Sequence, residues 1–256
     1  DGKGNTVKAG AIVVLDVKTG DGAFMKTLED SKALAREMVQ IGTLAGRDMS
    51  AVISDMDQPL GYAVGNALEV KEAIATLNGN GPEDLRELVL VLTSLMVVKA
   101  GKAKDIREAR ILLEETLDSG KALQVMKEWI VAQGGTAEEV EHPDLLPQAL
   151  CQEAVCAEKS GFVTKIHTEE IGRICMLLGG GRAKKGDPID LSVGLVLRKK
   201  VGDPVHSGES LAILHANDRE KLAEAKERLL KAYEIKKEPV AVRPLIWEIL
   251  DGTEAE

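Results

Sequence analysis

The chain has 256 residues, a net charge of -9 and only 2% aromatic residues. An acidic surface repels nucleic-acid phosphates, and so few aromatic side chains cannot provide a stacking platform for bases, so a nucleic-acid partner is not expected. No apolar run approaches the ~20 residues of a membrane span, and no signal peptide is expected. We therefore expect a cytoplasmic protein of one large or two modest domains, with Cys151, Cys156 and Cys175 reduced.

The first part of the sequence predicts a βαβ unit. Ala11 to Val17 is a mostly apolar run, typical of a strand buried on both faces, and Met49 to Ser54 predicts a second short strand. Between them, Ser31 to Ala45 predicts a helix with Asp30 as its cap. Its apolar residues at helical spacing are Leu34, Met38, Ile41 and Leu44. Strand, helix and strand in this order predict a right-handed, parallel unit.

Helices dominate the next segment. Four are predicted, over residues 66–77, 83–100, 105–119 and 121–133. A polar, acidic stretch with two prolines, from Thr136 to Pro147, predicts a domain boundary. We therefore expect an α/β domain with a mostly parallel sheet and many helices over residues 9–147, after a linker or truncation point at residues 1–8.

The remaining sequence predicts a smaller α+β domain of barrel-sandwich type over residues 160–236, followed by a C-terminal tail over residues 237–256. A strand (Gly161 to Ile166), a helix (Thr168 to Leu178), a β-rich stretch (Pro188 to Ala216) and a helix capped by Asp218 (Arg219 to Glu234) are expected here. The turn from Val201 to Val205 resembles that of biotinyl and lipoyl carrier domains. No Met-Lys pair lies in this region, so we expect the fold without an organic cofactor.

A proline turn and a small-residue helix start follow the second strand, in SDMDQPLGYAVGNALEVKE (residues 54–72). Ligands bind at the carboxyl ends of parallel strands, and small residues let a ligand approach the backbone. The alternative is a packing turn in which Gly61 and Gly65 allow two helices to approach closely. Asp16 and Lys18 lie at the carboxyl end of the first strand, where either a chemical role or a structural ion pair is possible.

Three segments resemble the pyrimidine-nucleoside and thymidine phosphorylase family, in that family's order. They are LDVKTGDGAFM (residues 15–25), ISDMDQPLGYAVGNALEVKEAI (53–74) and GGGRAKKGDPIDLSVG (179–194). The bacterial pyrimidine-nucleoside phosphorylases are the closer branch. The resemblance implies reversible phosphorolysis of uridine, thymidine and deoxyuridine to free base and (deoxy)ribose 1-phosphate, with pyrimidine nucleoside and phosphate as ligands. A relative of anthranilate phosphoribosyltransferase is the second choice, which the β-rich C-terminal domain disfavours.

The resemblance also implies a potassium ion bound by the backbone carbonyls of Leu60 and Ala63 and by the Glu72 carboxylate. Oxygen ligands suit such a hard cation, and a single carboxylate suits its single charge. Without the resemblance, a solvated helix carboxylate is the better interpretation of Glu72. Phe24 corresponds to an aromatic residue near the pyrimidine ring, where it would stack on the base, but it could equally fill the core. Asp21 stands where the family usually carries a small residue.

The glycines at residues 179–181, followed by Arg182, do not match a phosphate-loop pattern and predict a structural turn. The family's phosphate loop of K-H-S-T-G-G type and its base-polarising Arg, S-x-x-x-K and His all lie upstream of this chain. Lys3 and Lys8 do not occupy the matching lysine position, so no catalytic residue is assigned. We expect the chain alone to be inactive. The family homodimer forms largely through helices that also lie upstream, and a non-catalytic binding or scaffold domain is the alternative function.

Overall fold

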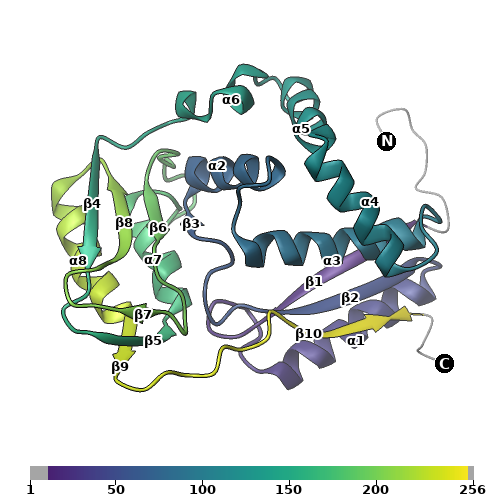
Figure 1. Ribbon diagram of the computed structural model, residues 1–256, viewed down its shortest axis with the longest axis horizontal. Helices are drawn as coiled ribbons and strands as arrows, with labels where there is room; N and C mark the ends of the chain where they lie inside the picture. The colour runs from purple at the N-terminus through teal and green to yellow at the C-terminus, as the bar shows by residue number, and fades with distance from the viewer. Residues whose placement is uncertain (1–10, 253–256) are drawn as a thin grey trace. The chain divides into compact units, whose positions relative to one another are not determined.

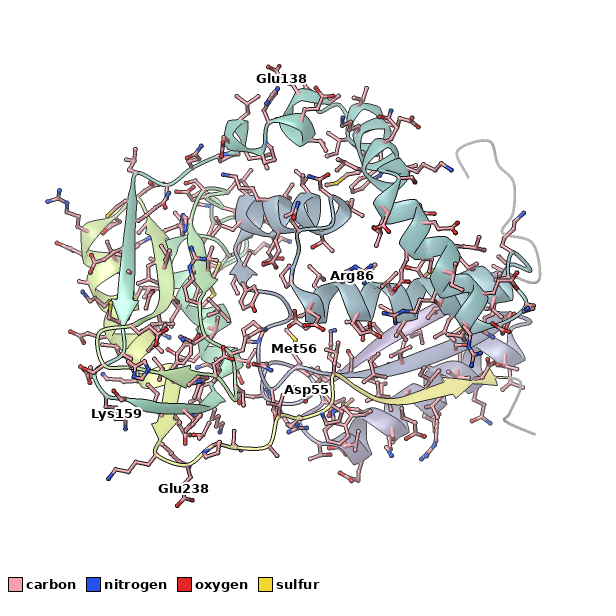
Figure 2. The ribbon with its side chains drawn as sticks, in the orientation of Figure 1. Asp55, Met56, Arg86, Glu138, Lys159 and Glu238 are labelled. Carbon is pink, nitrogen blue, oxygen red and sulfur yellow. The ribbon has the colours of Figure 1, made fainter. Side chains whose placement is uncertain are left out.

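The computed structural model describes residues 11–252, so the linker expected at residues 1–8 lies outside the described part (Figure 1). The chain forms two compact units, each assembled from separated segments. The first unit contains the described residues up to Met56, then Arg86–Thr116, and the described residues from Pro244 onward. The second contains Asp57–Leu85 and Leu117–Arg243. Figure 2 labels Met56 and Arg86, between which the chain contributes its first segment to the second unit.

The first unit is built around a three-stranded sheet with the order β1-β2-β10. Strands β1 (Ile12–Thr19) and β2 (Asp48–Asp55) pair in parallel, and helix α1 (Leu28–Leu44) connects them. This arrangement confirms the predicted βαβ unit. Strand β10 (Ile246–Asp251) adds to β2 in antiparallel orientation. The expected C-terminal tail thus contains a strand of this sheet.

Helix α1 differs from the prediction in its cap and in its buried face. Thr27, not Asp30, is the N-cap, because the Thr27 Oγ1 accepts the Asp30 backbone N–H at 3.2 Å. The helix buries Ser31, Ala35 and Val39 instead of the larger apolar residues that the spacing singled out. Small side chains on this face let the helix lie close to the strands. The core of the unit consists of Val17, Ala35, Val39, Met49, Ala51 and Ile53.

The four predicted helices are present and match their expected limits closely. They are α2 (Asn66–Leu77), α3 (Glu83–Lys99), α4 (Ile106–Asp118) and α5 (Lys121–Ala132). In the first unit, α3 and α4 are joined by a bidentate ion pair in which Arg110 Nη1 and Nη2 contact the two Glu87 carboxylate oxygens at 2.8 and 2.6 Å. A short helix α6 (Glu138–Glu141) and the 3-10 turn η1 (Pro143–Leu145) occupy the proline-containing stretch.

The second unit contains the smaller β-rich domain that the sequence predicts. One sheet has the order β3-β6-β8-β4, from strands Ala63–Val64, Gly194–Leu197, Ser210–Ala216 and Cys151–Cys156. The other has the order β7-β5-β9, from strands Pro204–Val205, Gly161–Ile166 and Tyr233–Lys236. Helices α7 (Thr168–Leu178) and α8 (Arg219–Ala232) pack on each other, and Asp218 caps α8 as predicted (Figure 1).

Strand β3 joins the motif segment to this β-rich domain. Ala63 lies opposite Val196 and Val64 opposite Leu195 at the edge of the four-stranded sheet. Gly65 (φ 140°) lies against the strand, where a Cβ would collide with the backbone of Val193. The close approach that its glycine allows is therefore to a strand, and not between two helices.

Candidate functional site

The candidate site is a loop held against the side of helix α2. Glu72, in the second turn of α2, turns back toward the chain that precedes the helix. Its Oε1 accepts the backbone N–H groups of Tyr62 at 2.9 Å and Ala63 at 3.0 Å. The sequence motif around residues 60–72 thus closes into one local structure, in which two residues of the loop are tied to the carboxylate.

The second oxygen of Glu72 has no hydrogen-bond donor among residues 11–252. It lies beside Gly61, where a Cβ would collide with Oε2, and the φ of 66° at Gly61 also favours glycine. Burial raises the pKa of the Glu72 carboxyl above its ordinary value, and the two backbone N–H donors oppose this shift. One carboxylate oxygen is therefore anchored while the other remains available to a ligand.

The register of β3 decides where the Ala63 carbonyl points. Tyr62 makes the ladder bond to β6, since its carbonyl accepts the Leu197 N–H at 2.8 Å. Ala63 is the next residue, so its own N–H and C=O face away from β6, on the side where Glu72 accepts its N–H. The carbonyl of Leu60 accepts no hydrogen bond from the described part of the chain. Among residues 11–252 the Leu60 carbonyl is thus not used by the fold, and the register turns the Ala63 carbonyl away from β6.

A cavity of about 470 Å³ opens beside this local structure, wholly within the second unit. Its lining residues are Tyr62, Ala63, Leu68, Lys71, Glu72, Ala75, Asn80, Gly81, Pro82, Val196, Leu197 and Arg198. Residues 11–252 contain no group of three or more His, Cys, Asp or Glu side chains that could hold a metal ion. A cation beside Glu72 would depend on carbonyl oxygens and one carboxylate, and this donor set fits a monovalent ion such as potassium.

Phe24 belongs to the first unit, in the turn after β1, and is 92% exposed. Its interpretation as a core residue is therefore wrong, because its ring is open to solvent. Leu60, Ala63 and Glu72 belong instead to the second unit. An exposed ring at the carboxyl end of a parallel strand is available to stack on a ligand.

The pair Asp16 and Lys18 forms the structural ion pair that the sequence left open, with Lys18 Nζ 2.7 Å from Asp16 Oδ2. Lys18 also donates to Ser54 Oγ at 3.0 Å, and Ser54 is fully buried at the end of β2. Sequence reasoning missed Ser54, although its position opposite Lys18 in a parallel pair could have indicated it. The glycines after Leu178 form the turn that ends α7, as predicted, with Gly179 as its C-cap.

None of the helices in residues 11–252 combines the length and apolar character needed to cross a lipid bilayer. Residues 162–236 match the family model for the pyrimidine nucleoside phosphorylase C-terminal domain. Residues 3–123 match the model for the glycosyl transferase family a/b domain.

Among curated proteins, the pyrimidine-nucleoside phosphorylase of Staphylococcus aureus (strain bovine RF122 / ET3-1) is 57% identical over 212 residues, covering 82% of this chain and 49% of the relative. That of Geobacillus stearothermophilus is 53% identical over 243 residues, covering 94% of this chain and 56% of the relative. The chain thus spans about half the length of the curated relatives it matches. These matches show that the chain belongs to the pyrimidine-nucleoside phosphorylase family.

Proposed function

We propose that this chain supplies the potassium site and part of the nucleoside pocket of a pyrimidine-nucleoside phosphorylase. The polypeptide that contains it would cleave uridine, thymidine and deoxyuridine with phosphate, giving the free base and (deoxy)ribose 1-phosphate. One observation carries the proposal: Glu72 is anchored to the loop through Oε1 and keeps Oε2 available beside Gly61. A carboxylate that only formed a solvated helix surface would not close on the backbone in this way.

In this proposal the carbonyl oxygens of Leu60 and Ala63 and the carboxylate of Glu72 would hold the ion, together with ligands from the upstream segment. The ion would supply a fixed positive charge near the phosphate-binding part of the enzyme. The chain's own contribution is to present Glu72 Oε2 and the Leu60 carbonyl without a competing hydrogen bond from residues 11–252, together with the Ala63 carbonyl on the side of Glu72. Phe24 would contact the pyrimidine through its exposed ring.

The reaction itself breaks the glycosidic bond between the sugar C1′ and the base nitrogen and forms a bond from C1′ to a phosphate oxygen. Its transition state carries positive charge on the sugar and negative charge on the leaving base, so groups must grip phosphate and polarise the base. The family supplies these groups from segments upstream of the residues matched here. We propose that the chain alone is inactive and that the complete enzyme works as a cytoplasmic homodimer.

A comparison of two glutamine variants tests the cation site in the complete polypeptide. Glu72→Gln keeps the shape and the acceptor for the two N–H groups but removes the charge. Glu83→Gln is the matched control, because Glu83 is an exposed glutamate of the same unit. Uridine phosphorolysis is measured against potassium concentration, with choline chloride keeping the ionic strength constant.

We expect the potassium concentration for half-maximal activity to rise by about tenfold or more in Glu72→Gln and to stay unchanged in Glu83→Gln. An unchanged potassium dependence in Glu72→Gln would remove Glu72 from the site. Turnover by the chain without its upstream segment would show that the proposed division of labour is wrong.

A further inference from the structure

The loop that carries the candidate ligands is held from a second side by residues outside helix α2. Lys200, in the turn between β6 and β7, donates from Nζ to the Pro59 carbonyl and lies 3.0 Å from Asp84 Oδ2. Only 12% of the Lys200 side chain is exposed. A lysine so enclosed needs its anionic partner, so this ion pair has a defined geometry.

Asp84 extends the contact to the next peptide of the loop. It lies in the first turn of α3, and its Oδ2 accepts the backbone N–H of Gly61 at 3.1 Å. Its Oδ1 accepts the N–H of Leu85 at 2.9 Å, so both carboxylate oxygens are engaged. Lys200 and Asp84 thus hold the two backbone groups on either side of Leu60, the Pro59 carbonyl and the Gly61 N–H.

Because the peptide group is planar, the contact between Asp84 and the Gly61 N–H also determines the orientation of a predicted cation ligand. The Leu60 carbonyl and the Gly61 N–H belong to the same planar, trans peptide group, in which they point in opposite directions. A hydrogen bond from that N–H to Asp84 therefore sets the direction of the Leu60 carbonyl. The plane cannot rotate to re-aim the carbonyl without breaking the bond to Asp84.

Further contacts fix the turn that carries Lys200. The backbone N–H of Lys200 donates to Asp203 Oδ2 at 2.7 Å, and the N–H of Val201 donates to Gln58 Oε1 at 2.9 Å. The Lys200 ammonium also lies 5.4 Å from the centre of the Tyr62 ring. The turn of the β-rich domain therefore contacts the loop of the candidate site at Gln58, Pro59 and Tyr62.

We infer that Asp84 and Lys200 are positioning residues for the cation site, which makes the turn between β6 and β7 a working part of that site. The inference rests on the proposed function. Lys200 lies within the residues that match the C-terminal domain model, whereas the loop, Glu72 and Asp84 lie within those that match the a/b domain model. The C-terminal domain would then set cation affinity by holding the Leu60 carbonyl in place.

Lys199 provides a matched control for Lys200. It is the neighbouring residue in the same turn, and its side chain is 16% exposed. Its ammonium contacts Glu209 and the carbonyl of Pro204, which lie in the β-rich domain and not in the loop. Lys199→Met therefore removes a charge and an ion pair from the same turn without touching the loop.

The test measures two quantities for the complete polypeptide against potassium concentration at constant ionic strength: uridine phosphorolysis, and the potassium-dependent rise in melting temperature without substrate, which reports binding alone. Lys200→Met is expected to raise the potassium concentration for half-maximal activity by about tenfold, with the rate at saturating potassium retained. Lys200→Arg, which keeps a charged donor, should recover most of the affinity. Lys199→Met should match the wild type. A purely structural role would lower the rate at every potassium concentration instead.

Asp84→Asn is the second variant, since it preserves the shape of the side chain and can be assayed if Lys200→Met does not fold. It should also raise the half-maximal concentration. If Lys200→Met and Asp84→Asn behave like Lys199→Met while Glu72→Gln weakens potassium activation, the inference is wrong and the proposed function stands. If Glu72→Gln has no effect either, the cation site itself is wrong, and the inference is lost with it.

Discussion

The two units of this chain are stabilised in different ways. The first unit is a small sheet whose three strands come from distant parts of the sequence, over a core of a few residues. In the second unit, two antiparallel sheets and helices α7 and α8 surround a larger continuous core. The candidate cation site lies on the second unit, where many fully buried side chains fix the backbone. A site that depends on carbonyl directions benefits from such a rigid support.

The boundaries of the family matches and those of the compact units do not coincide. The a/b domain match runs without interruption over residues 3–123. Within it, Asp57–Leu85 belongs to the same compact unit as the C-terminal domain. The comparison teaches that a segment can share its ancestry with one domain and its packing with another.

Removal of β10 gives the largest expected effect and tests whether the units are independent. A chain that ends at Arg243 exposes the edge of β2, whose residues Ala51, Val52 and Ile53 are fully buried. We expect a loss of about 3 kcal/mol or more in the first unit, since complete exposure of one such large side chain costs ~1.5–3 kcal/mol. Hydrogen exchange measured by mass spectrometry should show rapid exchange in β1 and β2 and unchanged protection in β8. Equal loss of protection in β8 would break the comparison, and a chain that ends at Asp251 is the control.

A core truncation in the second unit gives the next largest effect. Leu214 in β8 has no exposed surface, and Leu214→Ala should cost about 2–5 kcal/mol through lost burial and the cavity that remains. Urea denaturation gives the free energy of unfolding, and hydrogen exchange assigns it to a unit. Ile213→Ala is the control, because Ile213 precedes it on the other face of the strand and is only partly buried. An equal cost at both positions would contradict the assigned core.

Removal of a helix N-cap should have a smaller effect on stability, and each unit offers one such cap for comparison. Thr27 caps α1 and Asp218 caps α8 through their side-chain oxygens. Replacement of either by alanine should cost about 1 kcal/mol in its own unit. Thr27→Ser and Asp218→Asn keep an acceptor and should restore most of that stability. Exchange rates within the first turns of α1 and α8 provide the measurement.

The smallest expected effect is a difference in chemical reactivity between two cysteines, which involves no change in the free energy of unfolding. Burial raises the pKa of the Cys175 thiol to about 11, so this thiol stays protonated at neutral and mildly alkaline pH. Cys156 is exposed. Iodoacetamide should therefore modify Cys156 in the native protein, and Cys175 only in urea, as peptide mass spectrometry would show. Rapid modification of native Cys175 would indicate that the core of the second unit opens locally.

Much of the local structure could be predicted from the sequence, because helix limits and the βαβ unit depend on nearby residues. Strand β10 could not, since its partner β2 lies almost two hundred residues away in the chain. Strand β4 was also missed. It is a short edge strand in which Gln152 and Glu153 interrupt the apolar residues, so it has no continuous apolar run. The predicted cap of α1, Asp30, was wrong because the helix begins at Leu28 and not at Ser31, which makes Thr27 the N-cap.

The candidate site also has some residues that could be predicted from the sequence and others that could not. Leu60, Ala63 and Glu72 fall within one short motif, and hydrogen bonds between near neighbours tie Tyr62 and Ala63 to Glu72. Asp84 and Lys200 could not be predicted, because a single charged residue in a sequence carries no sign of its partner. Only the fold reveals that a turn far along the chain reaches the Pro59 carbonyl.

The pairing of β2 with β10 also has a consequence for biosynthesis. A ribosome makes β1, α1 and β2 early, yet the third strand of their sheet emerges only when residues 246–251 leave the exit tunnel. By then every residue of the second unit has been synthesised. The unit that contains β1 and β2 is thus completed after the second unit, and until then β2 has an unpaired edge of the kind through which partly folded chains associate.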